Sequence, residues 1–225
     1  MKRGKLPFDT RHFDKLKKQG KNLGTEETFR EIYRSNHWSG NKSVSGQGSD
    51  DEQTREISIQ IPRLINELGI KSFLDVPCGD FHWFSKLNVN LDSYTGGDII
   101  SEIVEKNNAL YKTDSRSFIK LDLIEDSLPK ADILLCRDCL VHLSYHDIEK
   151  VLENIRRSGI PYLLTTTFPN CDQNLDITTG DWRIINLEKA PFNLPEPIKI
   201  INEKCTEANG SYADKSLGLW KLQQL

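Results

Sequence analysis

Two short strand candidates in the 225-residue chain each have a carboxylate at or directly after their end. The first run, 72–76, contains Asp75, and the second run, 91–97, is followed directly by Asp98. In an open α/β sheet, ligands bind just beyond the carboxyl ends of the strands, and an acid about twenty residues after the first turn can accept hydrogen bonds from both hydroxyls of a ribose. The spacing therefore predicts a nucleoside-containing ligand that lies across two neighbouring strand ends.

The turn after the first run, Pro77-Cys78-Gly79-Asp80, argues against a ligand that contains a pyrophosphate. A dinucleotide site uses the pattern G-x-G-x-x-G so that the backbone can approach the pyrophosphate, whereas this turn has a single glycine, Gly79. Asp75 and Asp80 also place negative charge where a phosphate would be repelled, which suits a ligand with an amine or a sulfonium. Asp80 has a second interpretation, as the N-cap of a helix that begins here.

Alternating strands and helices are expected to position these residues. The expected strands are 71–76, 91–97, 116–121, 131–137 and 160–167, with helices at 81–87, 100–110 and 145–157. Alternation of this kind predicts an α/β fold, a mostly parallel sheet with helices on both faces. Two more strands, 197–203 and 216–222, have no long helix between them. The sheet is therefore expected to have seven strands and to end in an antiparallel hairpin.

The region before the first strand is predicted to hold two helices and a long loop. Thr25 is expected to cap a helix over 25–35, and Asp50 or Asp51 a helix that runs to Leu68 and ends at Gly69. Pro62 lies inside the second helix and is expected to kink or split it. The glycine- and serine-rich loop between them, 37–49, is either a linker or a lid over a ligand. Its one tryptophan, Trp38, favours a lid.

Composition sets the broad class of the protein. The chain is 37% hydrophobic, which is enough for one well-buried domain. No apolar run approaches the roughly 20 residues of a membrane span, and the basic N-terminal stretch is not expected to be a secretory signal because no apolar core follows it. The five cysteines are scattered, so neither a disulfide framework nor a metal site is expected, and we expect Cys136 and Cys139 to be structural. A cytoplasmic location is the expectation.

Positive charge is concentrated at the N-terminus. Residues 1–22 hold eight Lys/Arg and two Asp, a balance of +6, whereas the remaining chain carries −9. Such an arm either contacts an anionic partner or is only a solvated helix. We expect two parts: a basic helical extension with a ligand-covering loop, 1–49, and a main domain, 50–225.

Four segments carry a resemblance to a known family: FLDVPCGD at 73–80, YTGGDI at 94–99, the stretch 120–144 and YLLTTTF at 162–168. Together they resemble class I S-adenosylmethionine-dependent methyltransferases, over roughly residues 50–225. More narrowly, they are similar to small bacterial and viral methyltransferases that often lie beside, or are fused to, glycosyltransferases. The resemblance implies a Rossmann-like fold, a methyltransferase activity and S-adenosylmethionine as cofactor. It also implies a glycosyltransferase as partner or fusion.

The resemblance assigns cofactor-binding roles by position. Asp98 would accept from the ribose hydroxyls, and Asp122 would accept from the adenine amine unless it only caps the following turn. The remaining expected contacts are Ile99 and Leu123 at the adenine, Asp75, Pro77, Cys78, Gly79 and Asp80 near the methionine part, Arg137, and the lid residues Trp38, Ser45 and Gly46. The family's turn usually has two or three glycines, so Pro77 and Cys78 depart from its pattern.

Catalytic candidates lie in the segment 136–144, which follows the fourth strand. Methyl transfer to oxygen requires alignment of the nucleophile and removal of its proton. Asp138 or His142 could be the base, although His142 could also be a packing residue. Arg137 either pairs with an acid of a ligand or points outward.

The acceptor is expected to be a small molecule or glycan, in the first place a sugar. Thr167, Asn170, Trp182 and Arg183 are the expected contacts, because they combine hydrogen-bonding groups with an apolar ring; a polar loop closing on itself is the alternative. An N- or RNA-directed methyltransferase of the same fold remains open, although no aromatic and basic stripe along the body favours nucleic acid. A dinucleotide-dependent oxidoreductase and a non-catalytic binding module are further alternatives. The missing glycines oppose the first, and the retained acids Asp75, Asp98 and Asp122 oppose the second.

Overall fold

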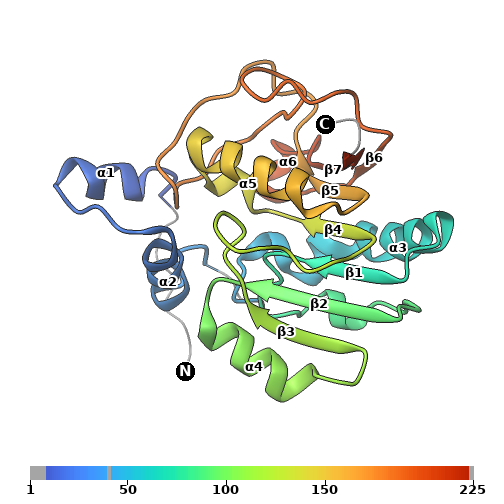
Figure 1. The fold of residues 1–225 in the computed structure, drawn as a ribbon. Helices are drawn as coiled ribbons and strands as arrows, with labels where there is room; N and C mark the ends of the chain where they lie inside the picture. The colour runs from blue at the N-terminus through green and yellow to red at the C-terminus, as the bar shows by residue number, and fades with distance from the viewer. Residues whose placement is uncertain (1–8, 40–41, 223–225) are drawn as a thin grey trace.

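The computed structural model describes residues 9–39 and 42–222, and the basic residues before position 9 lie outside the described part. A seven-stranded sheet with the order β3-β2-β1-β4-β5-β7-β6 forms its centre (Figure 1). The strands are β1 Ser72–Asp75, β2 Ser93–Asp98, β3 Arg116–Lys120, β4 Ile133–Cys136, β5 Tyr162–Thr167, β6 Lys199–Asn202 and β7 Ser216–Lys221. Strands β1 to β5 pair in parallel, and β7 runs antiparallel to both β5 and β6. The predicted fold class is confirmed.

The strand order reverses between β1 and β4. The chain moves from β1 outward to β2 and β3 and then returns to β4 on the other side of β1. Such a switch point opens a crevice at the carboxyl edge of a parallel sheet. The predicted site residues at the ends of β1, β2 and β4 therefore lie along one edge.

Helices cover both faces of the sheet. The helices are α1 His12–Lys18, α2 Thr25–Ser35, α3 Asp51–Leu68, α4 Ser101–Tyr111, α5 Tyr145–Ser158 and the short α6 Glu207–Gly210. Because side chains alternate along a strand, Leu74 packs with Ile148 of α5 on one face, whereas its neighbour Phe73 packs with Ile57 of α3 on the other. This two-sided burial holds the strand ends rigidly.

One helix prediction is wrong, and one of the two alternatives for Pro62 is excluded. No α-helix forms over 81–87, where only a 3₁₀ turn, Phe84–Lys86, is present. Phe81 adopts a left-handed backbone with φ 57°, and its ring packs against those of Phe84 and Tyr94. Burial of this aromatic cluster therefore takes precedence over helix formation. In addition, Pro62 does not split α3, which is continuous over its 18 residues because Ile61 and Leu64 beside it are buried in the core.

The helix ends agree with the predictions in part. Gly69 ends α3 in the left-handed conformation, as expected. Gly24 is the N-cap of α2, so Thr25 is the first helical residue and not the cap. Asp50 is the N-cap of α3, but its side chain makes no capping hydrogen bond.

The N-terminal helices lie at the carboxyl edge of the sheet, where the arrows of β2 and β3 point toward α2 (Figure 1). Asp181 anchors α1, since its carboxylate accepts from the backbone N–H of Phe13 at 2.8 Å and of Asp14 at 3.1 Å. No helix of the described residues is long and apolar enough to cross a membrane. All five cysteines are free.

Candidate active site

The turn after β1 is built around Gly79. Its φ of +52° lies in the left-handed region, and a Cβ at this position would lie 2.0 Å from the Ser45 Oγ, so any other residue would be strained and would displace the Ser45 side chain. The Gly79 N–H donates to Asp98 Oδ2 at 3.1 Å, and its carbonyl accepts from Asn107 Nδ2 at 2.7 Å. These bonds join the β1 turn to the end of β2 and to α4.

Asp80 holds the loop 42–49 against this turn. Its carboxylate accepts from Ser43 Oγ at 2.9 Å, from the Val44 N–H at 2.8 Å and from the His82 N–H at 3.2 Å. The N-cap interpretation of Asp80 is wrong, because no α-helix begins here. Its side chain closes a local turn and anchors a segment more than thirty residues away in sequence.

Two carboxyl groups are buried at the strand ends. Asp75 accepts from the Tyr94 hydroxyl at 2.7 Å, and burial raises its pKa to about 7. Asp98 accepts from the N–H groups of Gly79 and Ile100, and burial raises its pKa to about 6. A carboxylate oxygen has more than one lone pair, so Asp98 retains acceptor capacity for a ligand.

An inner cavity lies between these strand ends and α2. Every residue predicted to bind the cofactor lines it except Gly46: Trp38, Ser45, Asp75, Pro77, Cys78, Gly79, Asp80, Asp98, Ile99, Asp122, Leu123 and Arg137. Phe29, Ile32 and Tyr33 of α2 add an apolar wall that the sequence analysis did not identify. Asp122 also accepts from the Ile124 N–H at 2.8 Å, so the turn-capping interpretation holds beside its position in the cavity.

A second, outer cavity of about 520 Å³ adjoins the first. Its lining includes Gly46, Gly48, Phe168, Trp182, Glu207, Tyr212 and Lys215. Four residues line both cavities: Trp38, Ser45, Asp138 and His142. The two predicted base candidates therefore stand where the cavities meet.

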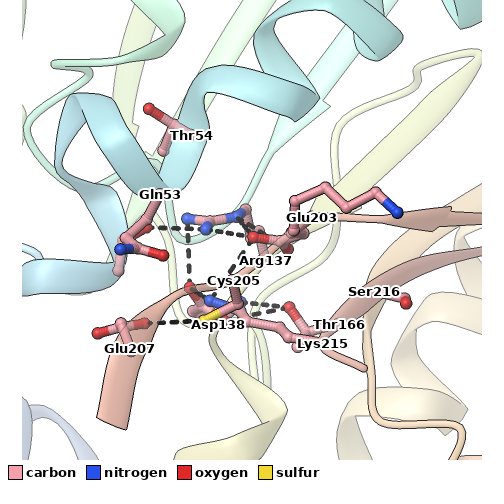
Figure 2. Close-up of polar contacts among 12 residues, drawn as sticks. Gln53, Thr54, Arg137, Asp138, Thr166, Glu203, Cys205, Glu207, Lys215 and Ser216 are labelled. Atoms are coloured by element: carbon pink, nitrogen blue, oxygen red, sulfur yellow. Dashed lines mark hydrogen bonds and ion pairs between the residues drawn. The ribbon is translucent and has the colours of Figure 1, made fainter. Parts of the chain in front are cut away.

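Asp138 belongs to a charged network (Figure 2). Its Oδ2 lies 2.7 Å from Lys215 Nζ and 3.2 Å from Arg137, and its N–H donates to Thr166 Oγ1 at 2.8 Å. Burial favours the neutral acid, but the two cations prevail and lower its pKa to about 2. Asp138 is therefore an ionised hydrogen-bond acceptor and a very weak base.

Arg137 is buried in the same network. Its guanidinium pairs with Glu203, with the shortest contact at 2.6 Å, and donates to the Gly48 carbonyl at 2.8 Å. The side chains of Arg137 and Glu203 are 4% and 1% exposed, so the outward-pointing alternative for Arg137 is wrong. Arg137 ties the end of β4 to β6 and to the loop 42–49.

His142 has the geometry of a base. Its Nδ1 lies 3.0 Å from the Asp181 carbonyl, which can only accept, so Nδ1 carries the proton and Nε2 has the free lone pair. Burial lowers its pKa to about 4, so the imidazole is neutral at physiological pH. The Trp38 ring stacks on it, with centroids 4.5 Å apart.

Of the four residues predicted to contact the acceptor, one lines a cavity and three do not. Trp182 lines the outer cavity. Arg183 lies elsewhere: its guanidinium donates to the carbonyls of Leu140 and Leu143 at 2.6 and 2.8 Å, which is a structural role. Thr167 is buried beside Leu187, and Asn170 is held by Asp214 through its backbone N–H. Neither is among the residues that line the two cavities.

Comparison with known proteins identifies the fold. No protein-family model and no curated protein matches the chain. Among solved structures, N-methyltransferase NodS from Bradyrhizobium japonicum WM9 is similar with a TM-score of 0.58 and 14% identity, over 76% of this chain and 97% of that one. PigF with SAH has a TM-score of 0.59 and 12% identity, over 94% and 66%. Human N-acetylserotonin methyltransferase in complex with SAM is similar with a TM-score of 0.57 and 14% identity, over 92% of this chain and 61% of that one.

The chain has the class I methyltransferase fold. The sequence analysis did not identify three residues that line the outer cavity, Glu207, Tyr212 and Lys215. They lie between β6 and β7, in a segment without apolar periodicity. A lysine and an acid in such a stretch carry no local signal of a site.

Proposed function

We propose that the protein is an S-adenosylmethionine-dependent O-methyltransferase that acts on a small polar acceptor, in the first place a sugar hydroxyl. One observation supports this above the others. An inner cavity with acids at two strand ends meets an outer polar and aromatic cavity at Asp138 and His142. A methyl donor in the first cavity and an acceptor in the second would bring their reacting atoms together there.

The inner cavity fits the donor chemically. Asp98 would accept from the ribose hydroxyls, and Asp122 from the adenine amine, with Ile99 and Leu123 against the ring. The buried Asp75 carboxyl suits the amine of the methionine part. The strand ends carry the acids Asp75, Asp80 and Asp98 in place of a glycine-rich turn, which favours this donor over a dinucleotide.

The donor supplies an electrophilic methyl group on a sulfonium. His142 is the proposed base, since its neutral imidazole can accept the hydroxyl proton at Nε2 without first losing one. Asp138 remains ionised and would orient the acceptor hydroxyl through a hydrogen bond. Trp38 stacks on His142 and would exclude water from the junction.

The biological setting is also part of the proposal. A sugar acceptor in glycan biosynthesis and a glycosyltransferase partner or fusion follow from the narrower sequence resemblance. A cytoplasmic location and a division into an extension, 1–49, and a catalytic domain, 50–225, follow from composition and pattern.

Calorimetric titration and thermal melting with S-adenosylhomocysteine and with NAD test the choice of cofactor. We expect the first ligand to bind and to raise the melting temperature, because a ligand that binds only the folded state stabilises it. Equal increases in melting temperature with both ligands would contradict S-adenosylmethionine as the cofactor. Incubation of an acceptor panel with isotope-labelled donor, followed by mass spectrometry, then tests for the gain of one methyl group.

A further inference from the structure

Three charged atoms converge beside Gly48 in the outer cavity. A Cβ placed on Gly48 would lie 3.2 Å from Asp138 Oδ2, 3.4 Å from Lys215 Nζ and 3.5 Å from Glu207 Oε2. We name these three side chains the polar corner. The absence of a side chain at position 48 keeps the space beside them open.

The polar corner offers both a donor and an acceptor. Lys215 Nζ donates to Asp138 Oδ2 at 2.7 Å and forms a longer ion pair with Glu203 Oε2 at 3.6 Å, so its ammonium keeps donor capacity for a ligand. The Glu207 carboxylate has a weak contact with Cys205 Sγ at 3.6 Å, visible in Figure 2, and keeps acceptor capacity. An adjacent ammonium and carboxylate match a pair of neighbouring hydroxyls.

An aromatic wall belongs to the same cavity. The rings of Trp182 and Tyr212 meet edge to face with centroids 4.9 Å apart. The centroid of the Phe168 ring lies 6.3 Å from that of Tyr212. Their surface suits the apolar C–H face of a sugar ring. The polar corner and this wall together suit a ring that carries hydroxyls on its edge.

Trp38 adds an independent sign of a ligand. Its Nε1 is buried without a hydrogen-bond partner among the described residues, and the side chain lines both cavities. A buried donor without a partner costs about 1–3 kcal/mol. A hydroxyl oxygen of a bound ligand would remove that cost.

The charge balance excludes anionic acceptors. The network around the polar corner contains three acids, Asp138, Glu203 and Glu207, and two cations, Arg137 and Lys215 (Figure 2). Both cations already contact carboxylates of the network. A phosphate or carboxylate in this position would therefore meet an excess of negative charge.

We infer that the outer cavity selects an uncharged sugar ring, that the polar corner binds two neighbouring hydroxyls, and that the Trp182–Tyr212 wall packs on the ring face. This inference rests on the proposed function and names Gly48, Glu207, Tyr212 and Lys215 as residues that determine acceptor specificity. The connection between β6 and β7, which supplies three of them, is the specificity element.

Saturation-transfer NMR on the full chain with bound S-adenosylhomocysteine tests this inference. The probes are methyl glycosides of common hexoses and the 6-phosphates of the same sugars. We expect at least one neutral glycoside to bind, and its phosphate to bind at least about tenfold more weakly. Binding restricted to the phosphates, or no glycoside binding, would overturn the inference.

Two pairs of variants locate the site. Gly48→Ala should abolish glycoside binding because its methyl group fills the polar corner, whereas Ser211→Ala on the exposed part of the same connection should not change it. Tyr212→Leu should weaken glycoside binding about tenfold, and Tyr212→Phe should preserve it. Thermal melting of each variant checks folding.

The outcomes separate the two proposals. Failure of S-adenosylhomocysteine to bind the unmodified protein contradicts the proposed function. If that ligand binds with normal affinity in all variants while Gly48→Ala and Tyr212→Leu leave glycoside binding unchanged, the assignment of the outer cavity is wrong and the cofactor assignment stands.

Discussion

At the scale of single residues, Asp138 and His142 line the same junction but differ in protonation because different neighbours act on them. Burial alone would make both groups neutral. Lys215 and Arg137 overcome burial at Asp138 and lower its pKa to about 2, whereas burial dominates at His142 and lowers its pKa to about 4. One residue is therefore a fixed anion, and the other has a free lone pair.

Replacement of the proposed base should affect turnover and not cofactor binding. We expect His142→Gln to lower kcat by roughly 10²–10⁴-fold, the usual contribution of a general base. Its affinity for S-adenosylhomocysteine should stay within about twofold of the unmodified protein. Steady-state kinetics with an accepted sugar and calorimetry measure the two quantities, and a loss of affinity with unchanged kcat would contradict the role.

Cofactor affinity should depend on the ionisation of Asp98. Asp98→Ala should weaken binding of S-adenosylhomocysteine by about 1–3 kcal/mol, the cost of unpaired hydrogen-bonding groups. Because the pKa of Asp98 is raised to about 6 by burial, acidification below that value protonates the carboxyl and removes an acceptor. Affinity should therefore fall from about pH 8 to about pH 5.5, and Asp138→Ala should leave affinity at neutral pH nearly unchanged.

At the scale of elements, the loop 42–49 is held near its start by the Asp80 carboxylate and at the Gly48 carbonyl by Arg137. Asp80 accepts two hydrogen bonds from Ser43 and Val44, and the Ser45 side chain then lies against Gly79. The part of the cavity wall around Ser45 therefore depends on the Asp80 side chain of the β1 turn.

Removal of that anchor should loosen the loop without unfolding the domain. In Asp80→Ala, we expect faster backbone hydrogen exchange in residues 42–49 and weaker binding of S-adenosylhomocysteine, because two loop contacts with Asp80 are lost. Asp92→Ala, at an exposed acid before β2, is the matched control. Unchanged exchange in the Asp80 variant would show that other contacts hold the loop.

At the scale of the whole molecule, the charged network connects the ends of three strands. Arg137 follows β4, Glu203 follows β6 and Lys215 precedes β7, and the side chains of all three are at most 6% exposed. Removal of one partner from a buried ion pair leaves an uncompensated charge.

We expect Glu203→Gln to lower the free energy of unfolding by about 3–5 kcal/mol, because Arg137 and Lys215 would then share Asp138 as their nearest acid. Glu196→Gln changes an exposed acid of the same type and should have little effect. Urea denaturation measures both variants, and equal midpoints would mean that the network contributes little to stability.

Stability should also depend on pH through the strand-end acids. Burial raises the pKa of Asp75 to about 7 and of Asp98 to about 6, above the values of the unfolded chain. The folded state then binds more protons, so this contribution to stability is lost as pH rises from about 4 to about 7. In urea denaturation of the ligand-free protein at several pH values, Asp98→Asn should reduce the fall in unfolding free energy between about pH 4 and about pH 7. An unchanged pH dependence would contradict a raised pKa of Asp98.

The sequence by itself determined the strands, the long helices and the acids at the strand ends, because apolar periodicity and turn residues act over a few neighbours. It did not determine the segment 81–87, where burial of Phe81 with Tyr94 overrides the helix pattern. Only the tertiary structure brought Lys215 and Glu207 to Asp138. That meeting depends on the order β5-β7-β6 and on burial of Arg137 with Glu203, which are long-range pairings that no local pattern encodes.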